Sequence, residues 1–272
     1  MKVKWYFWNH KIVINNNNYS TSIMNQTTPK SDLAKRLQDE ILSLQGFKTA
    51  SEGAKNSFDY GALEKAFPNQ VFPTGAVHEF LSGAREDAAA TTGFMMGLLG
   101  KLLQKGGACL WISMNRTLFP PAMKFFGIEP DRVIFIDLLK EQDVLWAVEE
   151  SLKCEALTAV VGELNEITLT QSRRLQLAVE QSRVTGFLHR CNPRSLNTLA
   201  CVSRWKVTPI PSQLEDDMPG VGFPRWHVQL LKVRNGEPGE WKMEWSDGRF
   251  NYLEQEVKMA TPFRKSTSPS AA

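Results

Sequence analysis

The sequence predicts an α/β fold with a mainly parallel sheet that ends in antiparallel edge strands. Between residues 58 and 190, short aliphatic runs alternate with helix candidates of roughly 12 to 18 residues, a spacing typical of right-handed βαβ crossovers. Beyond Arg190 the alternation stops. There "WHVQLLKV", "RNGEPG" and "EWKMEW" indicate two strands joined by a turn, so we expect them to pair as antiparallel edge strands.

The strand candidates of the alternating region are short, apolar and rich in branched or aromatic side chains. They are residues 76–80, 108–113, 133–137, 157–161 and 185–189. The helix expected after the first strand carries Gly93, Gly97 and Gly100 on one face. Glycine lowers helix propensity, so we expect this face to approach the sheet closely and packing to offset the cost.

Composition excludes several classes of protein. The 272 residues are 42% hydrophobic and 22% charged, as in an ordinary soluble globular protein. The uncharged stretch 88–100 is shorter than the ~20 residues that cross a bilayer, so no membrane contact is expected. A net charge of +3 limits any nucleic-acid contact to a local patch. The cysteines show no Cys-x-x-Cys spacing, so we expect reduced cytosolic thiols at Cys109, Cys154, Cys191 and Cys201.

The histidines favour no metal site. His78 lies in an apolar strand and is expected to be a hydrogen-bonded core residue, whereas His227 alternates outward on an edge strand. His189 and Cys191 supply only two donors, fewer than a zinc site needs. We therefore predict neither a metal nor a cofactor.

Four regions are expected along the chain. Residues 1–28 are predicted to be a disordered extension, in which Met24 is a second candidate start. Residues 29–57 form an N-terminal helix and linker, 58–256 the core domain and 257–272 a flexible tail. The helix is expected to be capped by Ser31 and to end near Gly46. One apolar stripe runs along it, consisting of Leu33, Leu37, Ile41 and Leu44. We favour a helix that lies on its own core over one that docks on a partner.

Three motifs carry a family resemblance. Pro73, Gly75 and Glu79 have the spacing that leads into the phosphate loop of RecA-type ATPases, and "EDAAATTGF" and "SRRLQLAVEQS" follow in order. From about residue 58 to residue 233 the chain resembles the RecA-like domain of the ImuA family, bacterial proteins of error-prone repair. The resemblance implies a RecA-like P-loop NTPase fold.

The loop itself lacks the residues that hold phosphate. A working Gly-x-x-x-x-Gly-Lys-[Ser/Thr] loop curls backbone N–H groups around phosphate and supplies a lysine. Aligned from Gly83, the Gly-Lys pair falls on Ala88 and Ala89; aligned from Thr91, it falls on Ala89 and Ala90. Losing one charge-assisted contact of this kind removes roughly 1.5–3 kcal/mol of binding free energy.

Other catalytic positions are replaced as well. Glu86 and Asp87 add negative charge beside the loop, and Asp87 is predicted to be the N-cap of the next helix. Where the resemblance implies a magnesium-binding aspartate, this chain has Gly162, and Glu163 is expected to point to the opposite face of the sheet. Where it implies a catalytic carboxylate, the chain has Asn115 or a neighbour, and an amide cannot take a proton from water. We predict that the protein is not an enzyme.

A short basic loop is the candidate DNA contact. The resemblance implies DNA-holding loops after the strands at 157–161 and 185–189, and the second offers Arg190 and Arg194. Arg173 and Arg174 on the preceding helix add to the patch, which could make weak phosphate contacts with single-stranded DNA. The alternative, a solvated loop with ordinary surface arginines, stays open.

The resemblance also implies partners. It implies a cytoplasmic, SOS-induced accessory factor, nucleoid-associated when active. The factor would act in translesion synthesis with an ImuB-like, Y-family-like polymerase subunit and an error-prone DnaE-type polymerase, with RecA as a further candidate. The apolar stripe of the N-terminal helix and the tail residues Phe263 and Arg264 are the expected contact segments. Two alternatives remain: a SulA-like inhibitor of cell division, and a DNA-dependent ATPase of the recombinase-paralogue kind.

Overall fold

The computed structural model describes residues 30–44, 58, 60–214 and 221–253. The chain divides into two units, residues 1–38 and 39–272. The predicted extension 1–28 and tail 257–272 lie outside the described residues.

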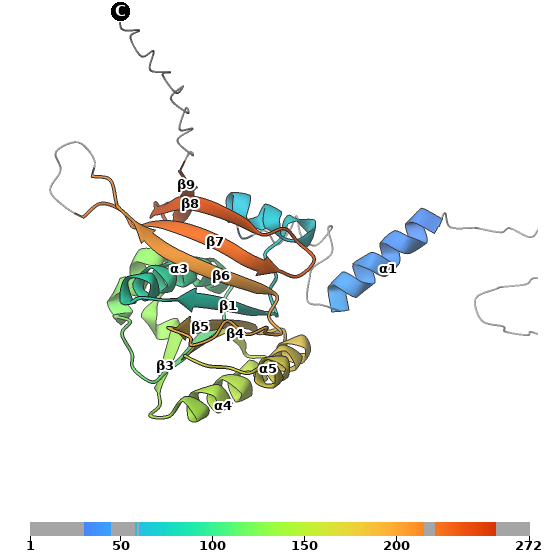
Figure 1. Cartoon of the computed structure of the whole chain (residues 1–272), viewed down its shortest axis with the longest axis horizontal. Coiled ribbons are helices and arrows are strands. Elements are labelled where there is room, and N and C mark those ends of the chain that lie inside the picture. The colour runs from blue at the N-terminus through green and yellow to red at the C-terminus, as the bar shows by residue number, and fades with distance from the viewer. Residues whose placement is uncertain (1–29, 45–57, 59, 215–220, 254–272) are drawn as a thin grey trace, which may run out of the picture. The chain divides into compact units, whose positions relative to one another are not determined.

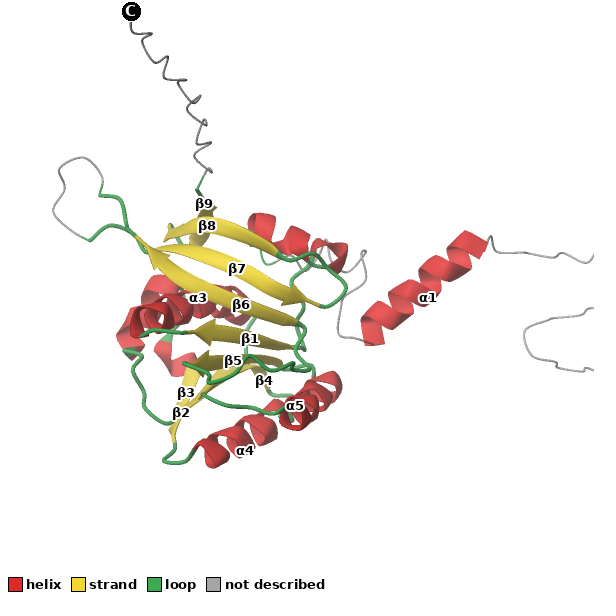
Figure 2. Ribbon diagram, in the orientation of Figure 1, coloured by secondary structure: helices red, strands yellow, loops and turns green. Residues whose placement is uncertain are grey.

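Among the described residues, nine strands form one sheet in the order β3-β2-β4-β5-β1-β6-β7-β8-β9 (Figures 1 and 2). The strands are β1 (Val77–Ser82), β2 (Ala108–Ser113), β3 (Val133–Asp137), β4 (Leu157–Leu164), β5 (Thr185–Cys191), β6 (Ser203–Ile210), β7 (Arg225–Val233), β8 (Gly239–Ser246) and β9 (Arg249–Tyr252). The strands from β3 to β6 in this order pair in parallel, and β7, β8 and β9 add antiparallel pairs. The predicted parallel sheet with antiparallel edge strands is confirmed.

Helices cover both faces of the sheet. Helix α3 (Arg85–Leu103) packs on one face, and α4 (Glu141–Leu152) and α5 (Leu169–Ser182) pack on the other. Short 3-10 helices occupy the connections: η1 (Gly61–Ala66), η2 (Pro68–Gln70), η3 (Pro120–Phe126) and η4 (Pro130–Arg132). Each face therefore has its own apolar core, as a sheet with helices on both sides requires.

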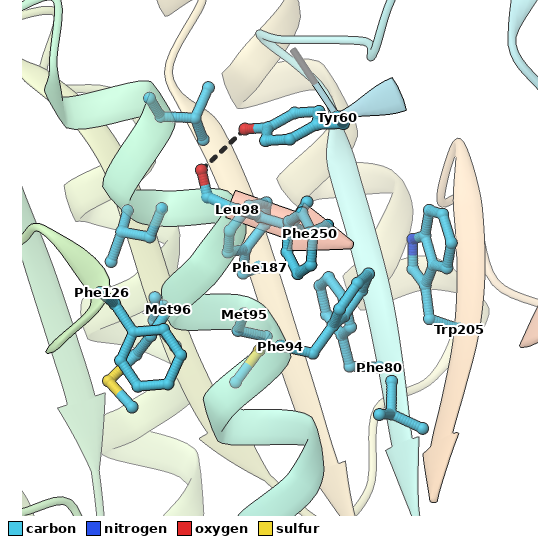
Figure 3. Close-up of a cluster of buried hydrophobic side chains, with 14 of the residues drawn as sticks. Tyr60, Phe80, Phe94, Met95, Met96, Leu98, Phe126, Phe187, Trp205 and Phe250 are labelled. Carbon is cyan, nitrogen blue, oxygen red and sulfur yellow. Dashed lines mark hydrogen bonds between the residues drawn. The ribbon is translucent and has the colours of Figure 1, made fainter. Parts of the chain in front are cut away.

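The core under α3 is rich in aromatic residues (Figure 3). Phe94 of α3 lies among Phe80 of β1, Trp205 of β6 and Phe250 of β9, with ring centroids between 5.4 and 6.4 Å from its own. The Tyr60 hydroxyl donates to the Leu98 carbonyl at 2.7 Å. These contacts join the antiparallel strands to the parallel sheet through α3.

Gly93 and Gly97 of α3 permit a close approach to the sheet, as predicted, whereas Gly100 approaches η3. A Cβ built on Gly97 would lie 2.6 Å from the Phe250 ring, and one on Gly100 would lie 2.2 Å from the Phe126 carbonyl oxygen. Real Cβ atoms essentially never come so close to a neighbour, so a side chain at either position would require the neighbour or the helix to shift.

Helix α1 (Lys30–Leu44) confirms the predicted N-terminal helix. It begins at Lys30, so Ser31 lies inside the first turn and does not cap it. Leu33, Leu37 and Ile41 are each about half exposed, and the side chain of Leu44 lies outside the description.

Candidate functional site

The loop between β1 and α3 is short. β1 ends at Ser82 and α3 begins at Arg85, so only Gly83 and Ala84 connect them. A phosphate-binding loop needs several residues between strand and helix, because successive N–H groups must surround the phosphate. The β1–α3 connection is therefore shorter than such a loop, and it also has no Gly-Lys pair.

A carboxylate of the chain itself bonds to the amides of this loop. Asp87 Oδ2 accepts hydrogen bonds from the backbone N–H of Gly83 at 3.3 Å and of Ala84 at 3.2 Å. Asp87 was predicted to be the N-cap, but Ala84 holds that position and Asp87 is the third helical residue. An acid at this position can bond back to the amide of the N-cap residue, as it does in a capping box. An anion thus already lies where a phosphate would meet the helix N-terminus.

The remaining loop residues belong to α3. Ala88, Ala89 and Ala90 lie in its first turns, and Thr91 is fully buried. The Ser82 hydroxyl donates to Thr91 Oγ1 at 2.9 Å and lies 2.8 Å from His189 Nε2. The Thr91 hydroxyl therefore lies in the interior, where it accepts the hydrogen bond from Ser82.

Burial also sets the charge of His189. Desolvation lowers its pKa to about 4, so its imidazole is neutral at pH 7. A neutral ring can share a hydrogen bond with Ser82 without the cost of a buried charge.

Glu163 and Gly162 face opposite sides of the sheet, as expected, but it is Glu163 that lies on the side of the loop. β4 continues to Leu164, and a Cβ on Gly162 would meet Val148 of α4, so position 162 faces the α4 side. Glu163 faces α3, the side on which the loop lies, and accepts a hydrogen bond from Trp111 Nε1 at 2.9 Å. Burial raises the pKa of Glu163, the Trp111 bond lowers it, and the charge of Asp137 raises it. A carboxylate is therefore present on the loop side, held by an indole N–H.

The residue expected in place of a catalytic carboxylate, at the end of β2, is an amide. Asn115 follows this strand and is exposed, and an amide has no basic site for a water proton. The next residue, Arg116, forms an ion pair with Asp137 at the end of β3. Arg85 is the only cation between Gly83 and Thr91, and it is exposed at the first position of α3.

Metal clusters and membrane-spanning helices are both absent from the part of the chain that the structure describes. Within them, no group of three or more His, Cys, Asp or Glu side chains is arranged to hold a metal ion. No helix in the described ranges is long and apolar enough to span a membrane.

The structure places Arg190 in the interior. Its side chain is fully buried, and the guanidinium donates to Glu79 Oε1 at 2.9 Å and to Glu166 Oε2 at 3.1 Å. Its other hydrogen bonds go to Asn165 and Asn197 and to the Ser195 carbonyl. An arginine enclosed in this way cannot reach a phosphate, so the prediction of a DNA contact at Arg190 is wrong.

Glu79 forms a second ion pair through its other carboxylate oxygen. Arg204 Nε donates to Glu79 Oε2 at 2.5 Å, so one fully buried carboxylate bridges two guanidinium groups. The sequence contained a signal for this network, because Glu79 stands in the middle of an apolar strand. A charge in such a strand needs a buried partner.

The other predicted basic residues are exposed. Arg194 lies on the loop after β5, and its bond to the rest of the described chain is that of its backbone N–H to Glu166. Arg173 is exposed on α5, and Arg174 beside it forms an ion pair with Glu149 at 2.8 Å. DNA contact at these residues stays a prediction. The other predicted contact residues, Phe263 and Arg264, lie outside the described residues.

This fold and this loop define a class of protein: a RecA-like α/β domain whose β1–α3 loop is bonded to its own carboxylate. The fold is similar to the crystal structure of the RadB recombinase, with a TM-score of 0.52 and 14% identity, covering 73% of this chain and 99% of that one. The sequence is 34% identical over 200 residues to Protein ImuA from two strains of Caulobacter vibrioides, covering 69% of this chain and 82% of the relative. The chain belongs to the ImuA family. No protein-family model matches it.

Proposed function

We propose that this protein is a non-catalytic RecA-like accessory factor of SOS-induced translesion DNA synthesis. Its role is to bring other proteins together, and the polymerase chemistry belongs to its partners. Membership of the ImuA family supports the placement in mutagenic DNA repair.

The observation that carries the non-catalytic role is the bond between the loop and Asp87. The two connecting residues, Gly83 and Ala84, give their amides to this carboxylate, and their segment contains no lysine. A nucleotide would have to displace the carboxylate and bring its own phosphate charge beside it, which costs binding free energy. Glu163 faces the same side, but because the loop does not bind nucleotide under this proposal, its carboxylate has no phosphate to act on.

This role predicts no response to ATP. Purified protein should hydrolyse ATP no faster than buffer, with or without single-stranded DNA, and ATP with Mg²⁺ should not change its Tm. A ligand present at about 100 times its Kd adds about 2.7 kcal/mol to the free energy of unfolding, so even moderate binding would be visible. A clear rise in Tm would contradict the proposal and favour the recombinase-paralogue ATPase.

The proposed partners are an ImuB-like, Y-family-like polymerase subunit and an error-prone DnaE-type polymerase, with RecA as a third candidate. We propose that the polymerase-like subunit binds the C-terminal hairpin and the tail that contains Phe263 and Arg264. The apolar stripe of α1 would meet either that subunit or RecA, since Leu33, Leu37 and Ile41 are available for a helix-in-groove contact.

Co-purification with two truncated chains tests the partner assignment. A chain that ends at Glu256 should lose the polymerase-like subunit while its circular dichroism stays unchanged, and a chain that starts at Gly46 should keep it. If both retain the subunit at full strength, its binding surface lies elsewhere on the core. In cells, deletion should abolish damage-induced mutagenesis. Filamentation on overexpression would instead favour the SulA-like alternative.

A further inference from the structure

An apolar groove of about 670 Å³ lies beside the first turns of α3. One wall is the α3 face that carries Ala89, Ala90 and Gly93. The lining also includes Ile210 at the end of β6 and Trp226 near the start of β7. The volume is in the range of sites that hold a small molecule or a few side chains of a peptide.

The mouth of the groove exposes apolar side chains and one unpaired charge. Val221 is 86% exposed and Phe223 is 37% exposed. Glu86 is exposed, and no residue in the described ranges forms a hydrogen bond or an ion pair with it. The cation of the groove, Arg225, is already bonded to Glu244 at 2.6 Å. The groove is therefore suited to an apolar side chain followed closely by a positive charge.

We propose that this groove binds the C-terminal segment 258–266 of the same chain. The segment reads "KMATPFRKS" and contains one aromatic residue, Phe263, followed directly by two cations, Arg264 and Lys265. Phe263 enters the apolar groove, and Arg264 pairs with Glu86. The segment supplies an aromatic side chain next to a cation, and the groove supplies an apolar lining and the Glu86 carboxylate.

The chain is long enough to reach. The N–H of Leu253, the last described residue, donates to the carbonyl of Lys242 at 2.9 Å, and Lys242 pairs with His227, the neighbour of Trp226. Leu253 thus lies about two strand spacings, or about 10 Å, from the strand that forms one wall. Phe263 follows ten residues later, and ten residues span up to about 33 Å. At this tether length the effective concentration of the segment is on the order of millimolar, so weak docking suffices to fill the groove.

This inference goes beyond the proposed function, because it concerns the isolated chain and requires neither nucleotide nor partner. The full-length protein can carry p-benzoylphenylalanine in place of Phe263, and ultraviolet light then links that position to whatever it touches. We expect a crosslink within one chain to Met96 or Trp226, both of which line the groove. Its yield should not depend on protein concentration.

Charge variants test the pairing. Glu86→Lys should lower the crosslink yield roughly threefold, the size expected for an exposed ion pair. Adding Arg264→Glu should restore the yield. Glu155→Lys, the same change at an exposed position between α4 and β4, is the matched control and should leave it unchanged.

Each other outcome overturns part or all of the proposal. Crosslinks between chains that increase with concentration would make a second copy the occupant. Crosslinks outside the groove, or none in a protein with an unchanged Tm, would refute docking. A crosslink to the groove that is equal in Glu86→Lys and Glu155→Lys would refute the charge pairing.

Discussion

Replacing Arg190 with alanine should destabilise the fold severely. The guanidinium is fully buried, and its removal leaves the Glu79 carboxylate with Arg204 as its remaining cation and removes the partner of Glu166. It also leaves the Ser195 carbonyl without this donor. Breaking a buried ion pair by removing one partner costs about 3–5 kcal/mol of the free energy of unfolding.

The surroundings of Glu79 place the expected loss near the lower limit. Arg204 still neutralises its charge at 2.5 Å, and Glu166 is partly exposed, so water can replace its lost bond. We therefore expect a loss of about 3 kcal/mol, which lowers the Tm of a core of this size by about 10 °C.

The assay compares Arg190→Ala with Arg194→Ala by thermal and urea unfolding. Arg194 is exposed and its bond to the rest of the described chain is made by its backbone N–H, so its variant should change the free energy of unfolding by less than about 0.5 kcal/mol. Equal Tm values for the two variants would refute the interpretation of Arg190 as a buried structural residue. Equal Tm values would instead indicate that Arg190 is exposed on the loop after β5.

Two further predictions concern pH and DNA. Burial lowers the pKa of His78 and of His189 to about 4, although a hydrogen bond to the Pro73 carbonyl raises that of His78. The unfolded chain takes up protons at these histidines near pH 6.5 and the folded chain does not, so the free energy of unfolding should fall as the pH drops from 6.5 to 4. From pH 7 to pH 5 the expected fall is about 2 kcal/mol for each histidine. Urea midpoints that stay constant over this range would contradict the prediction. Replacing Arg173 and Arg194 together with alanine should weaken binding to single-stranded DNA equally for all sequences and flatten its salt dependence, and unchanged binding and salt slope in a filter-binding or anisotropy titration would exclude this patch.

Much of the sheet was predictable, because buried parallel strands are continuous apolar runs. The strands that the prediction missed are those that lack such a run. β6 alternates buried and half-exposed side chains and contains Pro209. β9 has four residues and follows a tight turn at Asp247 and Gly248, both with positive φ. An Asp-Gly pair is a strong hairpin signal, so β9 could have been found from the sequence.

The site was predictable in residue type but not in geometry. The absence of a Gly-Lys pair follows directly from the letters around Ala89. That Asp87 bonds to the loop amides does not, because it depends on α3 beginning at Arg85. The burial of Arg190 was not predicted for a similar reason. The sequence gives the charge of a side chain but does not say whether that side chain is buried.

The bond from Asp87 to the loop has a consequence for control. In a nucleotide-binding relative, the loop is ordered by a ligand that comes and goes, so nearby surfaces can respond to the ATP supply. Here the anion is covalently part of the chain and is present at a fixed stoichiometry of one per loop. The carboxylate therefore bonds to the Gly83 and Ala84 amides without any added ligand. Under the proposed function, the protein's activity is set by how many copies the cell makes and by which partners are present.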